Sequence, residues 1–165
     1  MPRIFSFPPI AAIDARTLIL GSMPGEASLA AGQYYAHPRN AFWRIMAEVL
    51  RFDPALPYAG RVLALQAARI ALWDVLQSCA RTGSLDSAIE RDSLVVNDFK
   101  SFFREHRGIK RVFFNGATAE KSFNDHFRQS PDLTGIKFTR LPSTSPAHAG
   151  KSFAQKVIAW RAIAE

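Results

Sequence analysis

Residues 18–43 read LILGSMPGEASLAAGQYYAHPRNAFW, and this stretch decides the prediction of the fold. An apolar run from Thr17 to Leu20 is typical of a buried strand, and Gly21 breaks it. Tyrosine, histidine and proline side chains follow before a helical pattern starts at Asn40. Ligands of open α/β sheets bind beyond the carboxyl ends of the strands, so the stretch predicts a strand that leads into a pocket loop. An ordinary strand-to-helix connection stays open as the alternative.

The rest of the chain alternates between strand and helix patterns. We expect an extended lead-in, strands at 70–76, 111–114 and 136–141, helices at 40–51, 61–68 and 117–127, and a polar segment without a core element at 78–93. Further helices are predicted behind Asn97 as a cap, with Phe99, Phe102, Phe103 and His106 on one face, and behind a capping box of Ser152 and Gln155. This alternation predicts a single α/β domain over 1–165, a three-layer α/β/α sandwich with a four-stranded, mostly parallel central sheet.

The composition favours a polyanionic partner without proving one. Lysine and arginine number 21 against 14 aspartate and glutamate residues, a net charge of +7 that suits contacts to phosphates. The single cysteine, Cys79, excludes an internal disulfide and a cysteine-held iron–sulfur or zinc site within one chain. The first 16 residues contain three prolines and no long apolar run, so we expect a soluble cytoplasmic protein without a signal peptide, associated with the nucleoid in a prokaryote.

Two stretches carry a resemblance to a known family. GSMPGEASLAAGQYYAHPRNAFW at 21–43 resembles the first motif of the uracil-DNA glycosylase superfamily, in particular its hypoxanthine-DNA (deoxyinosine) glycosylase branch. LPSTSPAHA at 141–149 resembles the late loop with which the superfamily grips DNA, and ALWDVL and VFFNG fall in its strand order. The resemblance implies a monomeric hydrolase, free of metal and cofactor, that flips a deaminated base out of DNA and cleaves its N-glycosidic bond by water attack to start base excision repair.

The resemblance places a base pocket in two parts of the chain. Tyr35 is the expected stacking wall with Tyr34 second, and loop packing of both rings stays open as the alternative. Asp74 is expected to accept a hydrogen bond from N1–H of hypoxanthine, which adenine lacks, or else to be a buried residue that caps a turn. Uracil-cleaving relatives carry an aspartate or asparagine in the first turn, where this chain has Ser22 and Met23. The full predicted pocket is Gly21, Ser22, Met23, Pro24, Tyr34, Tyr35, Trp73 and Asp74.

Asn40 is the residue that the resemblance assigns to catalysis. Cleavage of the bond builds positive charge on the sugar and negative charge on the base, so an amide can hold a water or bind the leaving base, although it is no strong base. Asparagine is also among the best helix caps, and Asn40 stands where a cap is expected. From the residues alone the two roles are equally supported.

The late loop is expected to grip the DNA strand. Its predicted contacts are Pro142, Ser143, Thr144, Ser145, Pro146 and His148, with hydroxyls and backbone N–H groups on phosphates and Pro146, Ala147 or His148 in the gap left by the flipped base. Arg39, Arg140 and Lys151 are expected to add phosphate contacts. His37 is expected to hold loop geometry, and neither it nor His148 has a partner at metal-ligand spacing.

Other functions are kept as alternatives or excluded by pattern. A uracil or mismatch-specific glycosylase of the same superfamily, and a DNA-binding relative without catalysis, both stay open. A phosphate-binding loop is excluded, because GKS at 150–152 has Ser145 where that motif needs glycine. A serine hydrolase of the GxSxG type is excluded because the motif does not occur.

Overall fold

Four parallel strands form the central sheet of the computed structural model, which describes residues 2–127, 130 and 133–165. The strands are β2 (Thr17–Gly21), β3 (Ile70–Asp74), β6 (Arg111–Asn115) and β7 (Lys137–Leu141), in the spatial order β3-β2-β6-β7. All three pairings are parallel. The predicted four-stranded sheet is therefore confirmed. The strand β3 lies on one side of β2, and the later strands β6 and β7 lie on the other side. The order of strands therefore reverses next to β2.

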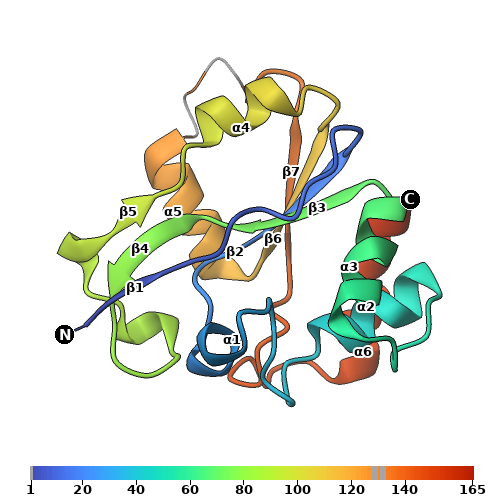
Figure 1. Ribbon diagram of the computed structural model, residues 1–165, viewed down its shortest axis with the longest axis horizontal. Coiled ribbons are helices and arrows are strands. Elements are labelled where there is room, and N and C mark those ends of the chain that lie inside the picture. The colour runs from blue at the N-terminus through green and yellow to red at the C-terminus, as the bar shows by residue number, and fades with distance from the viewer. Residues whose placement is uncertain (1, 128–129, 131–132) are drawn as a thin grey trace.

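The sheet is buried on both faces because successive side chains of β2 point in opposite directions. Leu18 and Leu20 belong to an apolar cluster with α4 (Phe99–Glu105) and α5 (Ala117–Phe127). Ile19 belongs to a second cluster with α2 (Phe42–Leu50), α3 (Tyr58–Ala67) and α6 (Phe153–Trp160). Figure 1 shows the two helical layers on opposite sides of the sheet, which confirms the three-layer sandwich.

A second, antiparallel sheet differs from the sequence prediction. Residues 70–76 do not form one strand, because β3 ends at Asp74 and the chain leaves the main sheet at Val75. The next strand, β4 (Leu76–Ala80), pairs instead with β1 (Arg3–Phe5) and β5 (Val95–Val96). The polar segment after Leu76 therefore contains a core element, contrary to expectation. Its polar side chains are satisfied there, since Ser78 is buried and its Oγ accepts a hydrogen bond from Arg3 Nη1 at 2.8 Å.

Several helix boundaries also differ from prediction. The helix α1 (Glu26–Ala31) lies inside the expected pocket loop and ends at Gly32, whose φ of 65° suits glycine. The helix α3 starts at Tyr58, three residues before the predicted start. Asp98, not Asn97, caps α4, because its side chain accepts a hydrogen bond from Ser101 N. The predicted capping box of α6 is confirmed.

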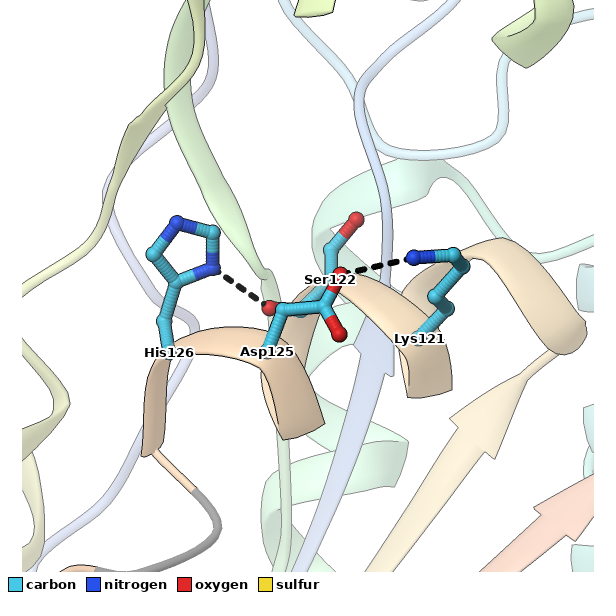
Figure 2. Close-up of polar contacts among 4 residues, drawn as sticks. All are labelled: Lys121, Ser122, Asp125 and His126. Carbon is cyan, nitrogen blue, oxygen red and sulfur yellow. Dashed lines mark hydrogen bonds and ion pairs between the residues drawn. The ribbon is translucent and has the colours of Figure 1, made fainter.

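The remaining described elements are short or superficial. Three 3₁₀ turns, η1 (Asp86–Ala88), η2 (Arg91–Ser93) and η4 (Arg161–Ala164), complete the fold. Figure 2 shows the exposed side of α5, where Lys121 Nζ lies 2.8 Å from Asp125 Oδ2 and His126 Nδ1 lies 2.8 Å from the Ser122 carbonyl oxygen. These contacts join neighbouring turns of one helix, so the cluster is satisfied locally. As far as the chain is described, every helix is too short or too polar to span a bilayer.

Candidate active site

A cavity of about 660 Å³ opens at the carboxyl edge of the main sheet. Gly21, Asp74 and Asn115 are the last residues of β2, β3 and β6, and all three line it. The volume lies within the range of small-molecule sites, and the position next to the reversal of strand order is where open parallel sheets bind ligands. Its remaining walls come from the turn at 22–28, from Tyr34, Tyr35, His37 and Asn40, from 84–87 and from 143–148.

Tyr35 lines the cavity with its ring fixed from behind. The ring stacks on Phe42 with centroids 4.2 Å apart and an interplanar angle of 19°. Its φ of 55° lies in the left-handed region, which costs energy for an aromatic residue and often marks a functional position. Burial raises the pKa of Tyr35, so the phenol is neutral and stays a hydrogen-bonding group. The ring is a preformed flat wall.

Tyr34 also borders the cavity, but it is chiefly a core residue. Only 3% of its surface is exposed, and its Oη donates a hydrogen bond to the Pro8 carbonyl oxygen at 2.9 Å. The edge of the ring packs against Phe7 with centroids 5.2 Å apart. Loop anchoring therefore describes Tyr34 better than base stacking does.

Trp73 lies outside the cavity, which corrects the predicted pocket. Neighbouring residues of a strand point to opposite sides, so Asp74 reaches the cavity while Trp73 packs against Phe99 and Phe102 of α4. The indole Nε1 of Trp73 donates to the Phe7 carbonyl oxygen at 3.1 Å. This side chain anchors the N-terminal lead-in and does not line the pocket.

Asp74 is a buried carboxyl group with one oxygen left unsatisfied. Its Oδ2 has no hydrogen-bond partner within the described part of the chain. Its Oδ1 crowds Gly21, where an added Cβ would lie 2.6 Å from that oxygen and 2.7 Å from Tyr35 Oη. Burial, and then the charge of Asp86, raise the pKa of Asp74 to about 7, against the opposing effect of Arg81. Near neutral pH this carboxyl group exists in both protonation states.

Asp86 is a second carboxyl group of the cavity, and the sequence prediction missed it. Ser22 Oγ donates a hydrogen bond to Asp86 Oδ1 at 2.8 Å. Burial raises the pKa of Asp86, while the Ser22 hydrogen bond and the Arg81 guanidinium oppose that rise. Asp86 belongs to the 78–93 segment, whose polar composition indicated a surface loop. One carboxylate among many polar residues gives no indication in the sequence that it belongs to a site.

Asn115 is another residue of the site that the sequence prediction missed. Its Nδ2 donates to Tyr35 Oη at 3.1 Å and to Thr144 Oγ1 at 3.0 Å, and its Oδ1 accepts from Thr144 N at 2.9 Å. One amide thus joins the stacking wall to the late loop. Its place at the end of a predicted strand, like that of Asp74, was the available signal.

Asn40 uses only one end of its amide within the protein. Its Oδ1 accepts a hydrogen bond from Phe42 N, the first N–H group of α2, at 2.9 Å. Its Nδ2 has no hydrogen-bond partner among the residues that the structure describes, and the residue lines the cavity. The N-cap of α2 is Ala41, so Asn40 stands one residue before the predicted cap position while its Oδ1 still accepts from the first N–H group of the helix.

The late loop borders the cavity and is held from below. Lys156 of α6 is buried, and its Nζ donates to the Ser145 and His148 carbonyl oxygens at 3.4 and 2.8 Å. Pro146, Ala147 and His148 are exposed on the rim. This arrangement supports the tip of the loop while leaving it free to meet a ligand.

Two residues of the late loop have structural duties in place of the predicted DNA contacts. Thr144 is 1% exposed and its polar groups are bonded to Asn115, so it cannot reach a phosphate as expected. Pro142 lies off the cavity, and its carbonyl oxygen accepts from Trp160 Nε1 at 2.9 Å. The part of the loop that can meet DNA is therefore shorter than predicted.

Two side chains outside the late loop are held by neighbours within the protein. Arg140, a predicted phosphate contact, pairs with Glu120 at 3.6 Å. His37 Nδ1 accepts a hydrogen bond from Arg39 N at 3.0 Å, in keeping with the expected role in loop geometry.

The comparisons with known proteins agree with this architecture. A model of the uracil DNA glycosylase superfamily matches residues 8–164. A hypoxanthine DNA glycosylase from Methanosarcina barkeri is 37% identical over 111 residues, 67% of this chain and 69% of that protein. A second protein of that name, from Methanosarcina acetivorans, is 32% identical over 145 residues, 86% of each chain.

A solved structure matches over nearly the whole chain. It is the solution NMR structure of a Methanosarcina acetivorans protein proposed to be a uracil DNA glycosylase. It is 28% identical in sequence, gives a TM-score of 0.80, and the match covers 99% of this chain and 100% of that one. The family predicted from the sequence is confirmed: this chain belongs to the uracil DNA glycosylase superfamily and is a DNA glycosylase.

Proposed function

We propose that this glycosylase removes hypoxanthine from DNA by hydrolysing the N-glycosidic bond of deoxyinosine. The observation that carries the proposal is the buried carboxyl group of Asp74, which lines the cavity and has one oxygen without a hydrogen-bond partner among the described residues. Leaving a buried carboxyl group partly unpaired is costly, and N1–H of hypoxanthine would give this group a hydrogen-bond donor. The names of the two curated relatives support the same base.

Neutral Asp74 suits this base better than ionised Asp74. Its carbonyl oxygen accepts from N1–H, and its O–H donates to O6 as negative charge develops on the leaving base. An ionised carboxylate would instead repel the departing anion in a site of low dielectric. The pKa of about 7 leaves a substantial neutral fraction at neutral pH.

Tyr35 and Asn40 complete the reaction site in this proposal. The flipped base lies against the Tyr35 ring, which Phe42 backs and Asn115 orients. The Nδ2 of Asn40 holds the water or the leaving base, while its Oδ1 remains bonded to Phe42 N. The fixed Oδ1 orients Nδ2 before substrate arrives, which is the form of preorganisation that favours catalysis.

The rim of the cavity grips the DNA around the lesion. The hydroxyls of Ser143 and Ser145, with exposed Arg39 and Lys151, contact phosphates, and Pro146, Ala147 or His148 enters the vacated stack. We propose that a monomer acts on each lesion. The proposed reaction uses no metal or cofactor, and we place the enzyme in the cytoplasm, associated with the nucleoid in a prokaryote.

The test is base release from matched duplexes that contain one deoxyinosine, one deoxyuridine or only normal bases, with abasic sites revealed by alkaline cleavage. Release from deoxyinosine far above the other two supports the proposal. Preferential release from deoxyuridine would overturn the choice of base while keeping the family. Tight binding without release from any substrate would favour a DNA-binding relative without catalysis.

A further inference from the structure

The segment 81–86 places the carboxylate of Asp86 against the turn at residues 21–25. Residues 21–25, GSMPG, contain no ionisable side chain. Two hydrogen bonds tie the segment to this turn: Arg81 Nη2 donates to the Pro24 carbonyl oxygen, and Ser22 Oγ donates to Asp86 Oδ1 at 2.8 Å. A third joins the segment to the first residue of α1, where Glu26 N donates to Ser84 Oγ at 2.9 Å. The segment therefore brings Asp86 to the first turn from 64 residues away in the chain.

Asp86 is both fixed and available for a ligand. Ser22 holds one of its oxygens, and the residue lines the cavity. Its Oδ2 has no hydrogen-bond partner among the residues that the structure describes. Unlike Asp74 Oδ2, this atom is not sealed from solvent. One oxygen is thus oriented by the protein while the other can bind a water.

Asp74 and Asp86 differ in what stabilises their charge. Asp86 has a hydroxyl donor on Oδ1 and the field of Arg81, whereas Asp74 Oδ2 has no donor at all within the described residues. When two such groups lie close together, the one with donors holds the negative charge and the other holds the proton. Asp86 is therefore the carboxylate of the pair.

We propose that Asp86, oriented by Ser22, is a catalytic carboxylate that holds and deprotonates the attacking water, an inference that rests on the proposed deoxyinosine hydrolysis. The water oxygen bonds to C1′ while its proton passes to Asp86 Oδ2. The C1′–N9 bond breaks, its electron pair leaves with the base, and the base regains a proton from Asp74 or solvent. The carboxylate also stabilises the positive charge that develops on the sugar, a task for which the Asn40 amide has no charge.

Burial raises the pKa of Asp86, and the Ser22 hydrogen bond and the Arg81 charge oppose that rise. Titratable and charged groups face it from several elements. From the elements packed around it these are Asp74 at the end of β3, Arg81 and Cys79 at the end of β4, and Tyr35, with Glu26, His37 and His148 around the same cavity. Since Asp86 must be ionised to accept the proton, the rate should fall as the pH falls through its pKa. This acid limb is the signature of the proposal.

The test is single-turnover base release from deoxyinosine duplex between about pH 5 and pH 9, with duplex affinity measured in parallel. Asp86→Asn keeps an acceptor for Ser22 and removes the charge. It should slow release ~100-fold or more at neutral pH, flatten the acid limb and leave affinity within ~3-fold. Release within ~3-fold of wild type, or a slower rate with the acid limb intact, would overturn the proposal.

Two further variants keep the test decisive. Asp92→Asn removes an exposed carboxylate of the polar segment 78–93 that does not line the cavity, so it is the matched control and should keep both the rate and the pH profile. Ser22→Ala removes the donor to Asp86, so the acid limb should move to higher pH, and an unmoved limb would count against the assignment even if Asp86→Asn does not fold. Wild-type protein that releases no base at all would refute the proposed function, a result distinct from an active wild type that is indifferent to Asp86.

Discussion

The amide of Asn115 donates a hydrogen bond to the phenol of Tyr35 across a distance of 3.1 Å. The same amide holds Thr144 through two more hydrogen bonds, so the stacking wall and the late loop share one support at the end of β6. Tyr35 comes from a segment 80 residues earlier, and its left-handed backbone persists because Asn115 and Phe42 hold the ring. In the proposed reaction, the reading of the base and the grip on the strand are therefore coupled through this single side chain.

Replacing Asn115 should damage both functions together. Asn115→Ala removes three hydrogen bonds, which should destabilise the protein by about 2–4 kcal/mol and slow deoxyinosine cleavage by at least ~10-fold. Thermal unfolding and single-turnover cleavage measure the two effects. Tyr35→Phe removes only one of the bonds and keeps the ring, so its losses should be smaller. Equal losses in the two variants would show that the contact to Thr144 contributes nothing.

Gly21 should tolerate no side chain. The Cβ of Gly21→Ala would lie 2.6 Å from Asp74 Oδ1 and 2.7 Å from Tyr35 Oη, distances that force one of the two groups to move. We expect base release to fall by at least ~100-fold, as a misplacement of about 1 Å in a site does. Gly60→Ala is the matched control, because its Cβ would make ordinary contacts with Leu56 at 3.5 Å or more and a helical Gly→Ala change is stabilising by ~0.5–1 kcal/mol. Full activity of Gly21→Ala would refute the close approach.

The buried carboxyl of Asp74 should make stability depend on pH. Its pKa is about 7 in the folded protein and near 3.8 when unfolded, so the folded state binds the extra proton between these values. The free energy of unfolding should therefore fall as the pH rises from about 4 to 7 and stay low above that range. Asp74→Asn should be more stable than wild type at pH 8 by on the order of 2–4 kcal/mol, with the difference vanishing below about pH 4. Denaturant unfolding at several pH values measures this, and a constant difference would contradict it.

The same variant should change the pH dependence of catalysis. If neutral Asp74 serves the leaving base, the wild-type rate falls as the pH rises above its pKa, and Asp74→Asn, whose amide still offers a donor and an acceptor, should lose that alkaline limb. Single-turnover rates at about pH 6 to 9 decide this. An alkaline limb that persists in Asp74→Asn must come from another group.

Lys156 should support the late loop without touching DNA. Lys156→Met removes the donors to the Ser145 and His148 carbonyl oxygens, so base release should fall by ~10-fold while the dependence of affinity on salt stays unchanged. Lys151→Met is the contrasting variant: Lys151 is exposed beside the loop, so its loss should reduce the salt slope by ~1. Duplex titrations at three or more salt concentrations distinguish the two, and a reduced slope for Lys156→Met would place its ammonium on a phosphate.

The sheet and its helices were predictable because their signals are local. The buried runs before Gly21 and Asn115 and the capping box of Ser152 and Gln155 each depend on neighbouring residues only. The break at Val75 was not predictable, since the apolar run continues into β4 while the hydrogen bonds pass to a different sheet. Pattern could not show that Trp73 faces α4, because a strand buried on both faces has no polar side to orient it.

The candidate site was predictable only where its residues follow a strand or lie in a recognised motif. Tyr35, Asp74 and Asn40 were found in that way and line the cavity. Asp86 reaches the cavity through contacts from 64 residues away in a segment of surface composition, and such long-range contacts leave no trace in a single sequence. The sequence likewise could not show that Thr144 is buried, because a serine- and threonine-rich loop is compatible with either environment.

The most direct test of the account is the detection of free hypoxanthine by chromatography and mass spectrometry after a single turnover on a deoxyinosine duplex, with abasic sites counted in the same sample. Wild type should release one free hypoxanthine for each abasic site. Asn40→Ala should release hypoxanthine ~100-fold or more slowly while it still binds the duplex. Absence of free hypoxanthine with wild type would contradict deoxyinosine as substrate, and near-normal release by Asn40→Ala would reduce Asn40 to a helix cap.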